Sequence, residues 1–209
     1  MISEQRVDQI ADALATDGYI IIDHILPDHL LSALQAQALS PTASQYKTAG
    51  VGREQNLQQV AAIRKDEISW IDDTNAAGKD YLAWMEYLRC ELNRRLFIGI
   101  FDYECHYAHY APGDYYKTHL DAFKGNTNRI VTTVLYLNAD WTSDNGGELV
   151  MYAPESNNVL QKILPEFGRL VIFLSDKFPH EVLPANKHRY SIAGWFRVNN
   201  SSSTRVDPA

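Results

Sequence analysis

Residues 169–198 read RLVIFLSDKFPHEVLPANKHRYSIAGWFRV, and this stretch decides the fold. An apolar run ends at Leu174, a shorter segment covers 180–183, and a third covers 188–198, with polar and turn-forming residues between them. β-Branched and aromatic residues fill the three segments, which favours strands. Their connections are too short for crossover helices, so we expect the strands to pair antiparallel.

The same two-residue period extends back to about residue 99. It predicts eight strands in all, at 101–110, 115–120, 129–137, 148–152, 159–163, 169–174, 180–183 and 188–198. Turn signals separate them, such as Ala111-Pro112-Gly113-Asp114 and Asp144-Asn145-Gly146-Gly147. Eight short strands with no helix between them predict an antiparallel sandwich or jelly roll. An up-and-down barrel has the same periodicity and stays open as an alternative.

The first half of the chain has a helical period instead. We expect helices at 2–16, with Ser3 as N-cap, from Pro27 in the first turn to about 39, and at about 79–97. A short buried strand is expected at 19–22. The chain is therefore predicted to be one domain, with mainly helical support at 1–98, a β core at 99–199 and a flexible tail at 200–209.

Composition narrows the function classes. The chain has 209 residues and 45% hydrophobic residues, enough for a sizeable core, and 19 Lys and Arg against 26 Asp and Glu give a net charge of −7. That balance argues against nucleic acid as the main partner. No apolar run approaches the roughly 20 residues that span a bilayer, and the acidic N-terminal segment does not resemble a signal peptide. Two cysteines are too few for a disulfide framework, so we expect a cytoplasmic protein without a membrane partner.

His119-Leu120-Asp121 places an imidazole and a carboxylate two residues apart, on one face of an extended backbone. By itself the pair means little, because this composition yields about one such pair by chance. His180, after the strand at 169–174, could complete a two-histidine, one-carboxylate triad, which binds Fe(II) and leaves coordination positions open. Arg189 stands in an apolar strand, where it needs an anion: either a small carboxylate ligand or a structural salt bridge.

The order of motifs in the second half is more specific than any one of them. The set comprises Tyr110-Ala-Pro-Gly113, His119-x-Asp121, Arg129 through Trp141, Gly146-Gly147-Glu148-Leu149, Gly168 through Asp176, Pro179-His180-Glu181-Val182 and Arg189-Tyr190-Ser191-Ile192. It resembles the 2-oxoglutarate- and Fe(II)-dependent oxygenases, and within them the EGL-nine-type prolyl 4-hydroxylases and their bacterial relatives. The resemblance covers roughly 45–198, including Ile63 through Ile71. It implies a mainly β protein, a double-stranded β-helix (jelly roll, cupin-like) with N-terminal helices packed on it.

The resemblance also implies roles for single residues. His119, Asp121 and His180 would be the iron ligands and the catalytic centre. Arg189, Tyr136 and Tyr110 would bind 2-oxoglutarate. The residues implied on the peptide side are Arg129, Trp195, Tyr116, Arg64 and Asp66, with a mobile loop at about 45–62 folding over the substrate.

Some details depart from the resemblance. Ser191 and Ala193 replace residues that are common in the family, which changes the hydrogen bonding expected around the co-substrate. Strand alternation places Tyr115 on the face of His119, whereas the resemblance places Tyr116 there. His106 and His109 precede the triad in the chain, and we expect packing or surface positions for them rather than ligation.

The activity implied is hydroxylation of a prolyl residue at C4 in a protein substrate, using O2 and releasing succinate and CO2, with L-ascorbate as reductant. Two alternatives stay open: a hydroxylase of a free amino acid or small metabolite, and a non-catalytic metal-binding jelly roll. The sequence identifies neither the substrate protein nor the oligomeric state.

Overall fold

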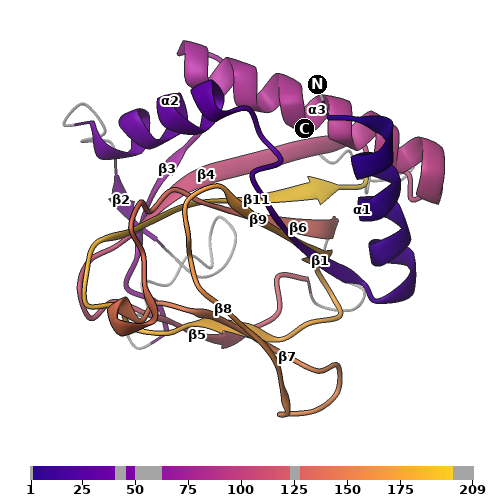
Figure 1. Cartoon of the computed structure of the whole chain (residues 1–209). Helices are drawn as coiled ribbons and strands as arrows, with labels where there is room; N and C mark the ends of the chain where they lie inside the picture. Colours follow the sequence, from indigo (N-terminus) through magenta and orange to yellow (C-terminus); the bar gives the residue numbers. More distant parts are fainter. Residues whose placement is uncertain (1, 41–45, 50–62, 123–127, 200–209) are drawn as a thin grey trace, which may run out of the picture.

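The structure is a computed structural model, and it describes residues 2–40, 46–49, 63–122 and 128–199. Within these residues two antiparallel sheets face each other, and three helices cover the outside of the larger sheet (Figure 1). The larger sheet has seven strands in the order β1 (Tyr19–Asp23), β9 (Arg169–Leu174), β6 (Arg129–Tyr136), β11 (Arg189–Arg197), β4 (Asp102–Tyr110), β3 (Glu67–Trp70) and β2 (Lys47–Thr48). The smaller sheet has β5 (Tyr116–His119), β10 (His180–Val182), β7 (Leu149–Tyr152) and β8 (Val159–Ile163).

The strand order identifies a jelly roll. From β4 onward the chain passes repeatedly between the sheets, so that β11 pairs with both β4 and β6, which are distant from it in sequence. An up-and-down barrel would pair each strand with its sequence neighbours. The barrel alternative is therefore wrong, and the predicted jelly roll is confirmed.

The eight predicted strands all form, each ending within one residue of the expected position. Two further strands, β2 and β3, were not expected because they are short and have no clear alternation. β3 pairs with β4, and β2 pairs with β3, so the N-terminal half supplies three strands of the larger sheet rather than helical support alone. Of the loop expected at 45–62, Lys47–Thr48 form β2, and 50–62 lie outside the described residues, as does the tail from 200.

The helices begin where polar side chains cap them. α1 (Glu4–Thr16) follows Ser3, whose side chain accepts from the N–H of Arg6, as expected. α3 (Ala76–Leu96) begins three residues earlier than predicted, because Asn75 accepts from the N–H of Gly78. α2 (Asp28–Leu39) has Pro27 at the N-cap rather than inside its first turn. None of the described helices is both long and apolar enough to cross a membrane.

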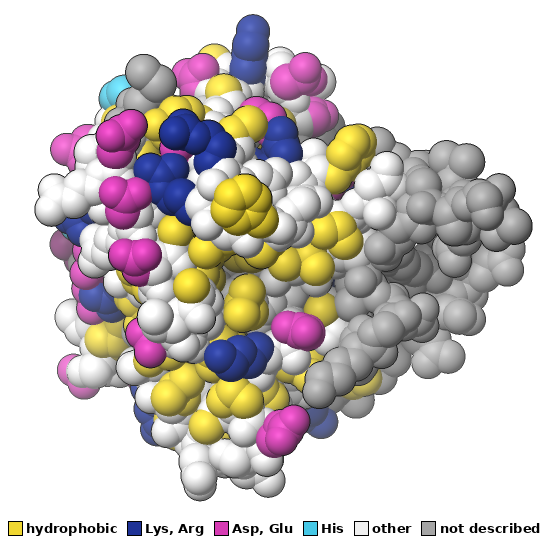
Figure 2. Space-filling model, turned by 90° about the vertical axis from the view of Figure 1, so that its right-hand side faces the viewer, with side chains coloured by type: hydrophobic (Ala, Val, Ile, Leu, Met, Phe, Trp, Pro, Cys, Tyr) yellow, Lys and Arg dark blue, Asp and Glu magenta, His cyan; other side chains and the backbone are white. Residues whose placement is uncertain are grey.

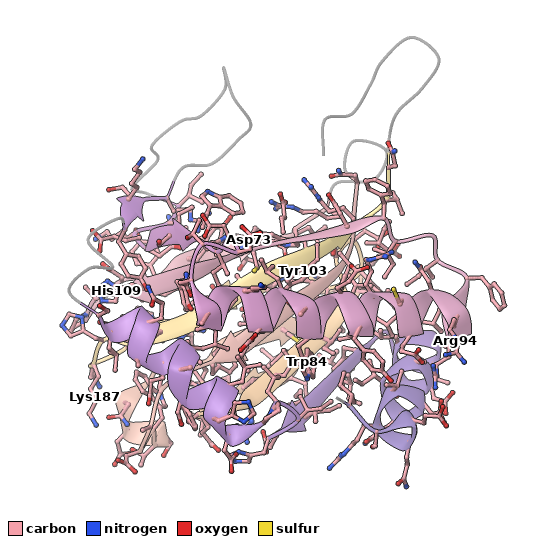
Figure 3. All side chains as sticks on the ribbon, turned by 90° about the horizontal axis from the view of Figure 1, so that it is seen from above. Asp73, Trp84, Arg94, Tyr103, His109 and Lys187 are labelled. Carbon is pink, nitrogen blue, oxygen red and sulfur yellow. The ribbon has the colours of Figure 1, made fainter. Side chains whose placement is uncertain are left out.

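Alternation along the strands divides the larger sheet into two faces. On β4, Cys105 and Tyr107 point to the helices, and Ala108 and Tyr110 point to the smaller sheet. α3 lies lengthwise over the outer face (Figure 3), where its Tyr81 hydroxyl is 3.2 Å from that of Tyr103. The inner face is different, because polar side chains interrupt its apolar cluster. A polar interior between two sheets indicates a ligand site.

One face of the outer surface carries apolar, basic and acidic side chains together (Figure 2). On the face shown in Figure 2, apolar side chains gather in the middle, and basic side chains occur in small groups beside acidic ones.

Candidate active site

Three candidate ligands meet where the smaller sheet opens. His119 ends β5 and His180 begins β10, and the two residues are direct partners in the antiparallel pair. The Nε2 atoms of His119 and His180 lie 3.6 and 3.7 Å from the two carboxylate oxygens of Asp121. One ligand atom from each residue lies within 4.8 Å of the others. Residues about sixty positions apart are thus brought around one point.

Backbone carbonyls orient both imidazoles. The Nδ1 atom of His119 lies 2.8 Å from the carbonyl of Lys117, and that of His180 lies 3.0 Å from the carbonyl of Phe178. A carbonyl oxygen only accepts, so each Nδ1 carries the hydrogen and each Nε2 keeps the lone pair that a metal needs. Such outer hydrogen bonds hold metal-binding histidines in the correct tautomer.

The carboxylate is also held. Thr132 on β6 donates to Oδ2 of Asp121 at 2.8 Å, and the Thr132 hydroxyl lies 2.9 Å from that of Ser175. Both hydroxyl residues are buried, with exposures of 2% and 0%. A fixed hydroxyl pair therefore sets the orientation of the Asp121 side chain.

The pKa shifts of Asp121 and His180 favour the protonation states in which these side chains bind metals. Burial by itself would raise the pKa of Asp121, but His180, His119 and Arg129 outweigh it and hold that pKa well below its usual range. Burial, and then the neighbouring His119, lower the pKa of His180 to about 4. A neutral imidazole and an ionised carboxylate are the forms that bind metals. Two imidazole nitrogens and one carboxylate oxygen fit Fe(II) and leave positions for a co-substrate and O2.

A buried cation, Arg189, lies on the inner face of the larger sheet. Arg189 is 1% exposed; its Nε donates to the carbonyl of Gly147 at 2.9 Å, and its Nη1 lies 3.3 Å from the Ser191 hydroxyl. The guanidinium carbon lies 4.9 and 5.1 Å from the ring centres of Tyr110 and Tyr136. No carboxylate of the described residues forms an ion pair with this arginine. The salt-bridge alternative for Arg189 is therefore not found there.

The Tyr136 side chain beside this arginine carries a hydroxyl group that needs a partner. The Tyr136 hydroxyl is buried and has no hydrogen-bond partner in the described part of the chain. Burial raises the pKa of Tyr136 to about 12, so the group stays a donor. A buried cation and a buried donor without an anion are both unfavourable. A dicarboxylate such as 2-oxoglutarate would satisfy both, because one end could reach the guanidinium while the other chelates the metal.

The position beside Arg189 requires a glycine, Gly147. Its φ is +72°, and a Cβ would lie 2.8 Å from that of Ala185 and 3.2 Å from Cδ of Arg189. A side chain here would displace the arginine. Ser191, where the sequence departs from the resembling family, contacts the guanidinium and so contributes to its placement.

Beyond the triad the inner face carries a second arginine. The guanidinium carbon of Arg129 lies 3.6 Å from the ring centre of Trp195, a cation–π contact. Its Nε and Nη2 donate to one oxygen of Glu104, and Arg197 donates to the other oxygen. Glu104 therefore holds Arg129 flat against the indole.

The opposite wall is built on Tyr116. Its ring stacks on that of His119 with centres 3.6 Å apart, and the guanidinium carbon of Arg64 lies 4.4 Å from the centre of the Tyr116 ring. Arg64 forms a bidentate ion pair with Asp66, which is fully buried. The pairing of β5 with β10 shifts register between Tyr116 and His119, so simple alternation fails here and the expectation for Tyr115 is wrong. Tyr115 instead lies beneath Lys65.

Comparison with known proteins agrees with this geometry. The model of the 2OG-Fe(II) oxygenase superfamily matches residues 105–197. The crystal structure of a Pseudomonas putida prolyl-4-hydroxylase is similar with a TM-score of 0.83 and 40% identity, over 93% of this chain and 100% of that chain. This chain belongs to the 2OG-Fe(II) oxygenase superfamily. A prolyl hydroxylase from Trichoplax adhaerens, solved with a hypoxia-inducible factor peptide fragment, has a TM-score of 0.79 and 33% identity over 93% and 90% of the two chains.

Curated relatives of this oxygenase match a shorter segment. Egl nine homolog 1 of Homo sapiens is 40% identical over 85 residues, which is 40% of this chain and 20% of that protein. The hypoxia-inducible factor prolyl hydroxylase of Caenorhabditis elegans is 31% identical over 144 residues, 64% of this chain and 20% of that protein. This chain thus spans about a fifth of the length of these two relatives.

Sequence reasoning missed several inner-face residues of this oxygenase. Thr132, Ser175 and Glu104 hold side chains of the site in place, and His106 faces the same interior although only packing or a surface position was expected for it. The sequence could have placed Thr132, Glu104 and His106 on this face. Each lies an even number of residues from Tyr136 or Tyr110 on the same strand, and such residues share a face. Parity places a residue on a face, but it does not reveal what that residue contacts.

Proposed function

We propose that this oxygenase binds Fe(II), 2-oxoglutarate and O2 and hydroxylates a prolyl residue at C4 in a protein, releasing succinate and CO2. The main support for this proposal is Arg189, a buried cation without an anionic partner among the described residues. It lies with Tyr136, whose hydroxyl is also unpartnered, in the interior that holds the cluster of His119, Asp121 and His180. A metal-binding protein without a co-substrate has no need of a buried arginine and a buried hydroxyl that both lack an anionic partner. The two similar solved structures, both of prolyl hydroxylases, support proline as the target.

His119, Asp121 and His180 would hold the iron. When bound, iron and 2-oxoglutarate supply the oxidising chemistry: the keto acid is oxidatively decarboxylated by O2, and one oxygen atom enters the substrate. The Nδ1 hydrogen bonds keep both imidazole lone pairs directed at the metal position. Thr132 and Ser175 keep the carboxylate from rotating away.

Arg189 would orient the co-substrate. Nε and Nη1 are held by Gly147 and Ser191, which leaves the remaining N–H groups to grip the C5 carboxylate through parallel hydrogen bonds. The Tyr136 hydroxyl would donate a further bond to the same group. This grip fixes one end of the molecule so that its other end reaches the metal in one orientation.

On the substrate side, Arg129 and Trp195 would form one wall, and Tyr116 with the Arg64–Asp66 pair the other. An aromatic surface beside an arginine suits a proline ring and the peptide groups on either side of it. L-Ascorbate would serve as the reductant that restores oxidised iron.

The test is turnover of the purified chain with Fe(II), 2-oxoglutarate, ascorbate and a panel of proline-containing peptides. We expect succinate to form together with a mass gain of one oxygen atom on proline, assigned to C4 by fragment and amino-acid analysis. Hydroxylation of free amino acids only would reject the protein-substrate proposal. Asp121→Ala should lose Fe(II) binding and turnover together, and undiminished succinate formation by that variant would reject the metal site.

A further inference from the structure

His106 is an unassigned residue on the substrate side of the inner face. On β4 it lies opposite Ala193 of β11 and Trp70 of β3. Its ring centre is 5.2 Å from that of Trp70 and 5.4 Å from that of Trp195. Trp70 is 57% exposed, whereas His106 is only 3% exposed. The imidazole is therefore the inner part of an aromatic surface whose outer edge faces solvent.

Two polar ring atoms on this surface have no partner. Nδ1 of His106 and Nε1 of Trp195 are buried and make no hydrogen bond in the part of the chain that the structure describes. More than nine in ten buried polar groups in proteins are hydrogen-bonded, so two orphans in rings that contact each other need an explanation. The Tyr136 hydroxyl is also buried without a partner, and there the proposed 2-oxoglutarate would supply one.

Charges around His106 decide which ligand suits it. Burial, and then the positive charges of Arg64 and Arg129, lower the pKa of His106 to about 3, with Asp121 acting in the opposite sense. The ring is neutral at physiological pH and can donate one hydrogen bond. A ligand cation is disfavoured by the two arginines. A prolyl residue has no amide hydrogen, so its surroundings in a peptide are rich in carbonyl acceptors and need donors from the enzyme.

We propose that His106 is a substrate-positioning residue, whose Nδ1–H donates to a main-chain carbonyl beside the target proline while the Trp195 indole N–H donates to a second one. The inference rests on the proposed function and deepens it, since two donors that bind two main-chain carbonyls suit a peptide, and a free amino acid has no peptide carbonyl to offer them. Glu104 supports the arrangement, because it fixes Arg129 against the same indole.

The test compares three variants for peptide KM and for peptide Kd, the latter measured anaerobically with Mn(II) and 2-oxoglutarate bound. His106→Met keeps the volume and loses the donor; we expect both constants to rise roughly 5- to 150-fold, the equivalent of about 1–3 kcal/mol. His106→Asn restores an N–H near the Nδ1 position and should recover part of the loss. His109→Met is the matched control. His109 lies on the opposite face of the same strand, at the margin of the molecule in Figure 3, and its ring is partnered by Glu67 and His188.

A second readout does not depend on a variant. In histidine-labelled protein loaded with Zn(II) and 2-oxoglutarate, long-range ¹H–¹⁵N spectra should show the Nδ1 signal of His106 shifting when peptide binds. An unmoved signal, or a His106→Met enzyme with the parent KM and Kd, overturns the inference while peptide hydroxylation stands. An equal loss in His109→Met also overturns it. Parent enzyme that hydroxylates no peptide overturns the proposed function, and this inference with it.

Discussion

Replacing Arg189 tests whether this protein is a 2-oxoglutarate-dependent oxygenase or only a metal-binding protein. The guanidinium is 1% exposed and is held by Gly147 and Ser191, so its free N–H groups are already oriented toward the pocket. Arg189→Lys keeps the positive charge but loses the planar pair of N–H donors that can bind both oxygens of a carboxylate. Truncating one member of a buried, hydrogen-bonded charge pair costs about 2–5 kcal/mol. At about 1.4 kcal/mol per decade, the affinity for 2-oxoglutarate should fall roughly 30-fold to several thousand-fold.

The measurement is calorimetric titration of 2-oxoglutarate into protein saturated with Mn(II) under anaerobic conditions. Mn(II) affinity without co-substrate should be unchanged, because the arginine is not a ligand. Arg169→Lys is the matched control. This arginine begins β9, which β6 separates from the β11 strand of Arg189, and it pairs with Asp23 near the surface, so 2-oxoglutarate should bind that variant like the parent.

Thermal unfolding adds a second measurement on the same variants. The parent should gain about 2.7 kcal/mol at a 2-oxoglutarate concentration of 100 Kd, and Arg189→Ala should gain far less at that concentration. Without ligand, the free energy of unfolding of Arg189→Ala should fall only by the contribution of the lost side-chain packing. No anionic partner among the described residues loses its cation in this variant. If Arg189→Ala binds 2-oxoglutarate as tightly as the parent, the anion is held elsewhere and the reasoning is wrong.

Three further outcomes are expected. Thr132→Val removes the hydrogen bond to Asp121 and should weaken Mn(II) binding about 10- to 100-fold, while an unchanged Kd would show that the hydroxyl does not orient the carboxylate. Gly147→Ala should lower the free energy of unfolding by roughly 1–3 kcal/mol in a denaturant titration and also weaken 2-oxoglutarate binding, and parent-like values of both would contradict the clash. In the metal-free protein the folded pKa values of His106 and His180, about 3 and 4, lie below the unfolded value of 6.5, so the unfolded chain binds more protons in this window. Stability should therefore fall as the pH drops below about 6.5, and chemical denaturation of His106→Met across pH 4–7 should show a smaller slope than the parent.

Local patterns were enough to predict most elements. The strands from β4 to β11 were placed within a residue because alternation and turn residues act between near neighbours in the chain. The missed strands β2 and β3 have two and four residues, too few for a period to appear. The start of α3 was misplaced because its Asn75 cap precedes the apolar stripe that was used to find it.

The site residues, like the strands and helices, could be predicted only in part from the sequence. From the sequence alone came the residue types: a His-x-Asp pair, a later histidine, and an arginine in an apolar strand, with the order of motifs that resembles a family. Only the tertiary structure decided that His119 and His180 are direct partners, that Tyr116 rather than Tyr115 stacks on the triad, and that Arg189 has no ion pair with a described residue. Each of these depends on the register between strands far apart in the chain or on a local shift of that register. The side-chain period repeats within one strand, but which residues meet across strands is set by packing of the whole interior, and that packing also left His106 beside Trp195 with a hydrogen-bonding atom unused.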